Sequence, residues 1–393
     1  MKITAIEDLH ADGGWRTLSF LKITTDEGLV GWSEFQEGPA TPGLAAVIRK
    51  MAQGVIGEDP RRINAICARL YATSRNVAGG MVAQAIAAIE NACIDLKAKA
   101  LGIPVSDLFG GAFHDRLPLY WSQCGTLRTR YPDLFGTPQL RSMDDIVNLG
   151  KEVQAKGFKA LKTNVLLFEG GQAFNYRPGF GIGAGHPERN LEGAALAGLV
   201  DLLSAFREGA GPQTELLLDL NFNFRIEGVR RIARALEPFN LMWLELDVYD
   251  PRALAAMRES TSTPIASLES LYGRQALRPY LDANAVDVAI VDPQWNGLTE
   301  SLKMASLVDS YDVNLASHNY HGQLSTLMGA HFSASIPNSR IVEFVVDEAD
   351  WTRDFLTHPL VIESGELVLP TRPGWGSDIV EDAVRARPAR AKY

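Results

Sequence analysis

The chain has 393 residues, of which 46% are hydrophobic and 22% are charged, so it has the ordinary composition of a globular protein and is long enough to bury a sizeable core. Its net charge of −9 argues against a nucleic-acid partner and gives no basic surface for a membrane. Three scattered cysteines exclude a disulfide framework and a cysteine-based metal site. Because the sequence opens directly into a strand pattern, without a signal peptide or a membrane-spanning run, we expect a cytoplasmic protein.

The N-terminal part has the pattern of a small sheet followed by helices. Apolar residues alternate in three short segments, which predict antiparallel strands at residues 3–9, 20–25 and 29–34. Over residues 81–101 the apolar positions recur at steps of three and four, which predicts a helix that ends at Gly102. We therefore predict an α+β capping domain over residues 1–115, with the segment from about 365 to 393 packed on it.

From residue 116 to 364 the pattern changes to short apolar strands that alternate with helical stretches. The predicted strands cover residues 117–122, 158–164, 215–220, 241–246, 264–268, 286–292, 313–317 and 340–344. Eight such units predict an α/β catalytic domain, a (β/α)8-type barrel. About two dozen extra residues, roughly 167–191, follow the second strand; they are too rich in glycine for a regular helix, and we expect a long loop that serves as a lid or an interface arm.

Chemically active side chains stand at the ends of six predicted strands, about one βα unit apart. From the third strand to the eighth they are Asp219, Glu245, Glu269, Asp292, His318 and Glu343. In this type of barrel, groups at the carboxyl ends of the strands converge on one site. The first three are acids that would repel one another unless a cation joined them, and oxygen ligands suit Mg²⁺. We predict one Mg²⁺ per subunit here; the alternative is three separate helix caps or salt-bridge partners.

The remaining strand ends supply a base and a cation. Asp292 and His318 follow neighbouring strands, so the carboxylate can orient the imidazole and raise its basicity, although a lone histidine is more often structural. On the second strand, Lys162 and Asn164 are two residues apart and are expected to share the barrel interior. Lys162 then lies beside the acids, unless its side chain extends to solvent.

These residues resemble the enolase superfamily and, within it, the mandelate racemase subgroup. The segments at 55–64 and 85–111 resemble the family's capping domain. The strand-end series matches the family's three metal ligands, its Asp-His dyad and its final acid. Among its members, acid-sugar dehydratases such as galactonate dehydratase are the most similar, because they too carry Lys-x-Asn on the second strand.

The sequence departs from the family pattern at several of these positions. Asn164 stands where mandelate racemase has a second lysine base, and Asn221 stands where galactonate dehydratase has a histidine that assists the leaving hydroxide. Leu268 precedes Glu269 where glycine is usual, and Glu245 is followed by Leu-Asp where Glu-Pro is usual. With Asn164 unable to carry a proton, the resemblance favours one-base elimination over two-base racemisation.

The resemblance implies a lyase that converts an aldonic or aldaric acid into a 2-keto-3-deoxy acid with Mg²⁺. His318 would remove the α-proton with Asp292 orienting it, while Lys162 and a protonated Glu343 would stabilise the charge that develops. The distal end of the substrate would meet the capping domain and nearby polar groups, for which the candidates are Trp15, Arg16, residues 35–37, Asn164, Asn221 and Tyr320. Candidates for a second acid that assists loss of the hydroxyl are Tyr320, His321 and His186.

Two alternatives to the dehydratase remain open. One is a racemase, epimerase or cycloisomerase that uses the same enediolate chemistry, and the other is a non-catalytic metal-binding or regulatory relative. In each case we expect a small-molecule carboxylate as the partner, no nucleic acid or membrane, and a homo-oligomer.

Overall fold

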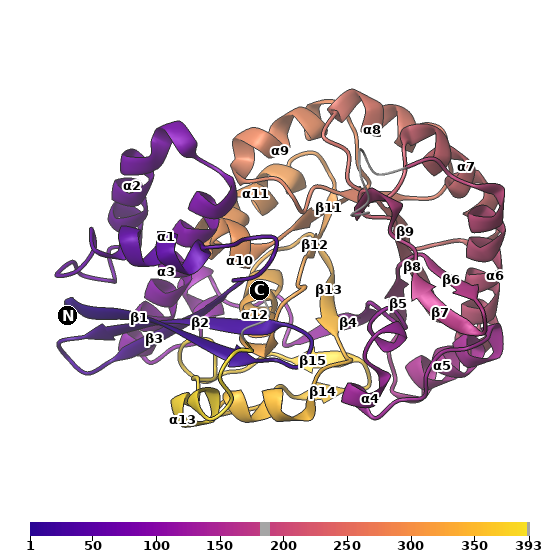
Figure 1. The fold of residues 1–393 in the computed structure, drawn as a ribbon. Helices are drawn as coiled ribbons and strands as arrows, with labels where there is room; N and C mark the ends of the chain where they lie inside the picture. Colours follow the sequence, from indigo (N-terminus) through magenta and orange to yellow (C-terminus); the bar gives the residue numbers. More distant parts are fainter. Residues whose placement is uncertain (181–188, 391–393) are drawn as a thin grey trace.

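Parallel strands close into a barrel in the computed structural model, which describes residues 1–180 and 189–390 (Figure 1). In spatial order its eight strands are β4 (Arg116–Ser122), β5 (Ala160–Thr163), β8 (Glu215–Asp219), β9 (Trp243–Glu245), β10 (Ile265–Ser267), β11 (Val288–Val291), β12 (Asn314–Ser317) and β13 (Ser339–Val345), and β13 pairs back onto β4. The predicted (β/α)8-type barrel with an α+β unit before it is confirmed.

Helices form a ring outside the strands, as Figure 1 shows. They are α5 (Met143–Ala155), α6 (Gly193–Ala210), α7 (Ile226–Leu236), α8 (Pro251–Arg258), α9 (Gly273–Asp282), α10 (Pro293–Asn296), α11 (Leu298–Asp309) and α12 (Gln323–Ala334), with a short α4 (Pro132–Phe135) after β4. The strands are apolar on both faces because helices cover one side and the barrel interior the other. No helix among the described residues combines the length and the apolar character needed to cross a membrane.

The barrel interior below the strand ends is filled by side chains. Large and small residues alternate around it, with Tyr120 and Trp243 in edge-to-face contact at 5.7 Å between ring centroids. Alanines at 160, 266 and 316 make room for these two rings. The floor of the site is therefore a packed apolar layer.

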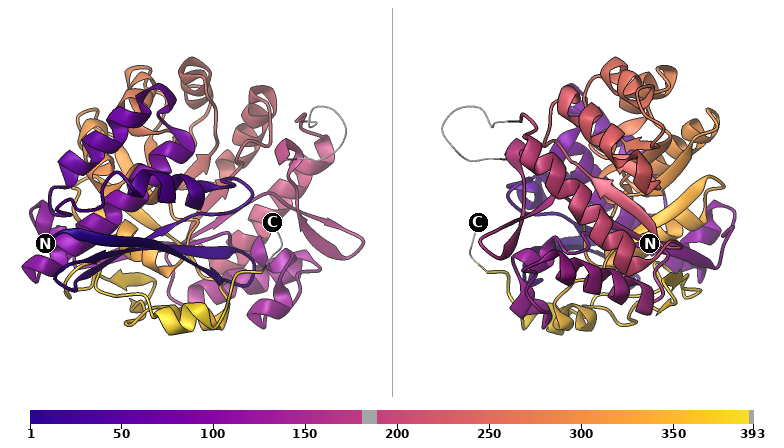
Figure 2. Two further views of the ribbon diagram at one scale, coloured as in Figure 1. Left: turned by 60° about the vertical axis from the view of Figure 1, so that its left-hand side comes forward. Right: turned by 90° about the vertical axis from the view of Figure 1, so that its right-hand side faces the viewer.

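The N-terminal unit packs against one side of the barrel (Figure 2). Its strands β1 (Ile3–Asp12), β2 (Thr17–Thr25) and β3 (Val30–Phe35) form an antiparallel sheet, and its helices are α1 (Leu44–Ala52), α2 (Ile63–Ser74) and α3 (Gly80–Leu101). Helix α3 lies so close to β3 that a side chain at Gly31 would meet the Ala92 carbonyl oxygen at 2.3 Å. The sequence positions of this sheet and of α3 match their predictions.

The C-terminal segment touches both parts. Strand β15 (Glu366–Val368) pairs with β4 and with β14 (Ile362–Glu363), and α13 (Glu381–Arg385) lies near β1. Between them the buried Trp375 donates its backbone N–H to Asp95 and its indole N–H to the Trp32 carbonyl oxygen. The segment thus joins the barrel to the N-terminal unit.

Short 3-10 helices complete the described chain at η1 (Arg75–Val77), η2 (Val105–Phe109), η3 (Leu127–Thr129), η4 (Pro178–Phe180), η5 (Glu237–Phe239) and η6 (Asp350–Phe355).

The segment after β5 begins with a β-hairpin, which the prediction of a long loop over residues 167–191 did not include. Strands β6 (Leu166–Glu169) and β7 (Gln172–Asn175) pair across Gly170 and Gly171, both with positive φ. A two-residue turn of this kind needs positive φ at both positions, so the glycines mark a hairpin turn. The hairpin projects from the barrel in Figure 2. Residues 181–188 of the predicted loop, including His186, lie outside the described residues.

Candidate active site

Three acids gather at the ends of β8, β9 and β10. Asp219 and Glu245 are the last residues of their strands and are direct partners in the sheet, and Glu269 follows β10 by two residues. Burial, opposed by Lys162 but reinforced by Glu269, raises the pKa of Asp219 to about 6. Burial and the Glu245 charge raise the pKa of Glu269 to about 7, although His318 opposes this. Acids that resist ionisation together are the setting in which a cation binds well.

The backbone before Glu269 is strained. Leu268 has a φ of 96°, a conformation that costs a non-glycine residue about 1–3 kcal/mol. The strain lies at the position where the resembled family usually has glycine, so the structure explains that preference. Leu268 is buried, and its packing offsets part of the cost.

Lys162 lies at the centre of the acids. Its Nζ is 3.0 Å from Glu245 Oε2 and 3.1 Å from Glu343 Oε1, and its side chain is only 4% exposed, so it does not extend to solvent. Burial favours the neutral amine, but the Glu245 and Glu343 charges overcome it and hold the pKa of Lys162 well above its ordinary value. Lys162 is therefore a fixed positive charge.

The surroundings of Glu343 favour its ionised form, because its carboxylate lies beside the Lys162 ammonium, whereas a protonated form was expected from the sequence. Its Oε1 accepts a hydrogen bond from the Ser122 hydroxyl, and its Oε2 accepts one from the Asn319 backbone N–H at 2.8 Å. Burial raises its pKa, but the Lys162 and His318 charges and these hydrogen bonds lower it to about 2. The partners come from other strands, so the sequence around Glu343 gives no sign of them.

Asp247 is a further acid of the cluster that the sequence analysis did not select. It is buried two residues after Glu245, and its backbone N–H donates to the Asn221 carbonyl oxygen. Burial and the charges of Glu269 and Asp219 raise its pKa well above the ordinary value. The alternation of side chains along an extended segment could have identified it, because residues 245 and 247 face the same way.

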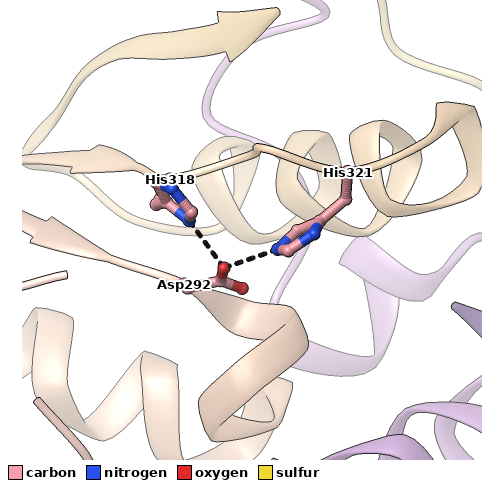
Figure 3. Close-up of side chains that lie close together, drawn as sticks. All are labelled: Asp292, His318 and His321. Atoms are coloured by element: carbon pink, nitrogen blue, oxygen red, sulfur yellow. Dashed lines mark hydrogen bonds and ion pairs between the residues drawn. The ribbon is translucent and has the colours of Figure 1, made fainter. Parts of the chain in front are cut away.

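Asp292 binds two imidazoles with one oxygen, as Figure 3 shows. His318 Nδ1 lies 2.7 Å and His321 Nε2 lies 2.8 Å from Asp292 Oδ2. The other oxygen accepts the backbone N–H groups of Gln294 and Trp295 and so caps α10. Burial disfavours the carboxylate, but the two histidines hold the pKa of Asp292 well below its ordinary value.

These hydrogen bonds fix the orientation of His318. With Nδ1–H donated to Asp292, Nε2 faces the acids, 3.5 Å from Glu269 Oε2, and the Trp295 ring packs on the imidazole at 4.9 Å. Burial opposes protonation, but Glu269 and the Asp292 hydrogen bond raise the pKa of His318 to about 10. His318 can thus exchange a proton through Nε2 with a molecule bound beside the acids.

Among the described residues, two clusters of side chains are candidates for a metal site. Asp292, His318 and His321 have ligand atoms within 4.8 Å of one another, a tighter grouping than that of the three strand-end acids. However, Asp292 already accepts four N–H donors, and both imidazoles use an N–H rather than a lone pair toward it. The acids at 219, 245 and 269 offer hard oxygen donors that repel one another, so they fit Mg²⁺ better.

Asn164 and Asn221, predicted to bind substrate, hold Asp219 in place. Asn221 donates its backbone N–H to Asp219 Oδ1 at 2.7 Å and its amide N–H to Oδ2 at 2.8 Å. Asn164 donates to the Asp219 carbonyl oxygen at 3.3 Å and accepts from the Thr126 hydroxyl at 3.0 Å. The amides orient the acid through its hydrogen bonds.

A cavity of about 360 Å³ lies between the N-terminal unit and the barrel. The other predicted substrate-binding residues, Trp15, Arg16 and Tyr320, line it together with residues 35–37. Arg16 lies 4.4 Å above the Trp15 ring and donates to the His321 carbonyl oxygen at 2.6 Å. The cavity therefore adjoins the loop that carries the histidines.

Glu34 of β3 connects the same two parts and was also missed from the sequence. Its oxygens accept the backbone N–H groups of Gly322, at 2.5 Å, and Ser325, at 3.0 Å, at the start of α12. Burial raises the pKa of Glu34 to about 7 even though Arg16 opposes it. This contact joins residues almost 300 positions apart, and no local pattern predicts it.

Comparison with known families gives two matches that cover most of the chain. Residues 145–383 match the "Enolase C-terminal domain-like" family, and residues 13–110 match the "Mandelate racemase / muconate lactonizing enzyme, N-terminal domain" family. Among characterised sequences, the D-galactonate dehydratase of Ralstonia nicotianae is 30% identical, with 98% of this chain and 94% of that protein covered. The D-xylonate dehydratase of Haloferax volcanii is 28% identical, with 98% and 88% covered.

Solved structures are similar over the full length. A candidate L-alanine-DL-glutamate epimerase from Burkholderia xenovorans strain LB400 is 43% identical, with a TM-score of 0.97 and coverage of 100% of this chain and 99% of that one. The same protein bound to magnesium and fumarate gives a TM-score of 0.96, with 99% and 97% covered. The 3,6-anhydro-D-galactonate cycloisomerase of Zobellia galactanivorans, at 24% identity and a TM-score of 0.82 with 98% and 99% covered, shares the fold.

Proposed function

This chain belongs to the mandelate racemase and muconate lactonizing enzyme family of the enolase superfamily, and from that premise we propose that it is a Mg²⁺-dependent lyase that removes water from a sugar acid. The proposal rests on one observation: His318 is the single described residue placed to accept a proton from the substrate and to return it. His318 presents Nε2 toward the acids, whereas Lys162 is bound by Glu245 and Glu343, and the Asn164 amide is neither a base nor an acid near neutral pH. The dehydratases among its relatives support the same assignment.

Asp219, Glu245 and Glu269 are the residues that would hold the metal. Burial raises the pKa of each carboxyl, the behaviour of acids that lack sufficient positive charge. Mg²⁺ bound there would supply positive charge that stabilises the enediolate form of the substrate. The Burkholderia relative, solved with magnesium, supports this choice of ion.

The chemistry of the protein's own residues begins with proton removal. The α C–H bond of the substrate breaks, and the proton passes to His318 Nε2, while Asp292 keeps the imidazole in the correct tautomer. The fixed charge of Lys162 stabilises the negative charge left on the substrate. Neutralisation of the nearby acids would remove the main cause of the raised pKa of His318 and allow it to act as a base nearer neutral pH.

Loss of water follows from the same imidazole. The β C–O bond breaks, the imidazolium returns its proton to the departing hydroxide, and the enol product converts to a 2-keto-3-deoxy acid. Because one group removes and returns the proton, we expect syn elimination and no racemisation of recovered substrate. Tyr320 and His321 line the cavity and are the described alternatives for a second acid, which would make the elimination anti.

The second candidate function is epimerisation or racemisation, which the name of the Burkholderia relative favours. The test is NMR of aldonic and aldaric acids incubated with the protein and Mg²⁺ in deuterium oxide. Keto-acid formation without deuterium in recovered substrate supports the dehydratase. Deuterated, stereochemically altered substrate without keto acid would assign the protein to the isomerases. Absence of both reactions in wild-type protein that binds Mg²⁺ would indicate a non-catalytic relative, and His318→Asn is the control that removes the base.

A further inference from the structure

We propose that the cavity between the N-terminal unit and the barrel binds a second carboxylate, so that the substrate is a dicarboxylic sugar acid rather than an aldonic acid. This inference rests on the proposed function, which leaves both classes open.

The acids beside the cavity already accept hydrogen bonds from groups of the protein. Glu37 accepts the backbone N–H groups of Gly43 at 2.7 Å and Ala45 at 2.6 Å. Glu34 accepts two backbone N–H groups at the start of α12. Glu348, next to the cavity, accepts from Arg16 at 2.6 Å. A substrate ammonium would have to compete with each of these donors.

Donors, in contrast, remain unsatisfied within the described residues. Arg16 Nη1 and Trp15 Nε1 are buried and have no hydrogen-bond partner there. At the exposed rim, Arg130 and Arg177 also line the cavity, and the described chain gives neither guanidinium a carboxylate partner. The rings beside them are their main contacts, Tyr131 at 5.7 Å from Arg130 and Phe180 at 4.4 Å from Arg177.

One lining acceptor, Asn175 Oδ1, is also buried without a partner in the described chain. Its amide can turn about its terminal bond and present N–H donors instead, because the two orientations have the same shape. The cavity as a whole is therefore rich in donors and poor in acceptors. A buried donor without a partner is unfavourable, so a ligand that supplies acceptors is favoured.

A carboxylate supplies what is missing. It offers two oxygens with negative charge, the geometry that a guanidinium binds with two parallel hydrogen bonds. The terminal hydroxyl of an aldonic acid offers one neutral oxygen and leaves the arginine charges uncompensated. An aldaric acid and its aldonic counterpart differ only in this terminal group, carboxylate or hydroxyl, and the cavity can distinguish the two groups.

The cavity adjoins the candidate active site through two of its lining residues. Thr126 donates to Asn164, which holds Asp219, and His321 donates to Asp292, which holds His318. A volume of about 360 Å³ is within the range of small-molecule sites, roughly 300–1,000 Å³. One chain-like acid can thus have its reacting end at the acids and its other end at the arginines.

The test compares matched pairs that differ only at the distal carbon, galactarate with galactonate and glucarate with gluconate, in the presence of Mg²⁺. We expect kcat/KM for a dicarboxylate to exceed that for its partner by about 10- to 100-fold, the range of a charged hydrogen bond. Arg16→Gln and Arg177→Gln should each reduce this preference. Arg177 is exposed, so its variant is expected to fold even if the Arg16 variant does not. Arg116→Gln, an exposed arginine at the start of β4, is the control and should leave the preference unchanged.

Calorimetry separates this inference from the proposed function. In His318→Asn protein with Mg²⁺, a dicarboxylate should bind more tightly than its aldonic partner, and Arg177→Gln should weaken that binding. This result supports the second carboxylate site even if wild-type protein forms no keto acid, an outcome that would refute only the dehydratase. Equal or better turnover and binding of aldonic acids, or a preference that neither arginine variant changes, would overturn the inference while leaving dehydration intact.

Discussion

At the ends of β8, β9 and β10, burial and mutual repulsion raise the pKa of four carboxyl groups, whereas at the end of β11 the equally buried Asp292 has its pKa lowered. Asp292 is at least as buried as these four carboxyl groups, so burial alone does not explain the difference. Asp292 has a hydrogen-bond donor for each of its oxygens and two imidazoles beside it. Asp219 and Glu269 share the Lys162 charge with their neighbours, and Glu269 also has one imidazole, that of His318, beside it.

The difference assigns separate tasks to the two sides. Carboxylates that lack positive charge attract a cation, while a carboxylate with all its hydrogen bonds made can hold a base in one orientation. Position in the barrel does not by itself determine the direction of the pKa shift. The pKa of Glu343 is also lowered, because this residue contacts Lys162 and Ser122. Partners, rather than residue type or burial, determine the state of each acid.

The largest expected effect is on the imidazole side. Asp292→Asn should lower the rate of α-hydrogen exchange by about 10²- to 10⁴-fold, because His318 loses both its tautomer control and a neighbouring charge. Exchange into solvent deuterium, followed by NMR, measures the effect. Mg²⁺ affinity measured by calorimetry should change little. A parallel loss of metal binding would contradict the separation of tasks.

The second expected effect tests the shared cation. Lys162→Met should destabilise the metal-free protein by about 3–5 kcal/mol, because it leaves Glu245 and Glu343 buried without their partner. Urea unfolding at neutral pH measures the change. Lys156→Met, an exposed lysine that pairs with Glu152 on the surface of α5, is the matched control and should cost less than about 1 kcal/mol. Similar decreases in the free energy of unfolding in both variants would show that the buried ion pairs of Lys162 stabilise the protein no more than a surface pair does.

The third prediction uses pH. The pKa of Asp219 is raised from 3.8 to about 6 and that of Glu269 from 4.5 to about 7, so the folded metal-free protein binds these protons more tightly than the unfolded chain. Their stabilising contribution is therefore complete below about pH 4 and is lost as pH rises through about 6 to 7, at roughly 1.4 kcal/mol for each unit of pKa shift.

Added Mg²⁺ should offset that loss, since it binds the ionised acids. We expect the increase in Tm caused by Mg²⁺ to be small at pH 5 and several degrees larger at pH 8, as measured by thermal unfolding. Asp219→Asn should reduce this pH dependence. An increase in Tm that is the same at both pH values would show that the acids are not the binding groups.

The smallest expected effect sharpens the role of Asp292. Asp250 also precedes a proline and caps a helix, α8, by accepting the N–H groups of Arg252 and Ala253, but no imidazole binds it. Asn is as good a cap as Asp, so Asp250→Asn should change the free energy of unfolding by less than about 0.5 kcal/mol and leave activity unchanged. A clear loss of stability would mean that charge at the cap matters even without histidines.

The sequence predicts the strands and their terminal residues because both follow from spacing. From β8 to β13 the strands recur about every 25 residues, and Asp219, Glu245 and Asp292 each fall at a strand end. Spacing does not reveal partners from other strands, which is why the ionised state of Glu343 was missed. Nor does it reveal that Gly170 and Gly171 form a hairpin turn instead of an irregular loop, since the same residues suit both.

Contacts between distant segments lie further beyond local patterns. Glu34 caps α12 from the other end of the sequence, and Arg16 reaches Glu348. Such contacts depend on how the N-terminal unit sits on the barrel, which neither periodicity nor motif specifies. Asp247 is different, because its position two residues after Glu245 can be read from the sequence. Its place in the acid cluster was not predicted.

The placement of Trp375 has a consequence for how the chain reaches its native state. Its indole and backbone N–H groups bind Trp32 and Asp95, and Asp378 pairs with Lys99. The N-terminal unit, which is synthesised first, therefore makes some of its polar contacts with residues close to the C-terminus. During translation the N-terminal unit lacks these contacts until the C-terminal segment has been made, although Asp95 and Lys99 can already pair with each other. Contacts of such long sequence separation form slowly. A nascent chain that stops before Trp375 should therefore expose the N-terminal unit to proteases and chaperones, although it contains every residue of the candidate active site.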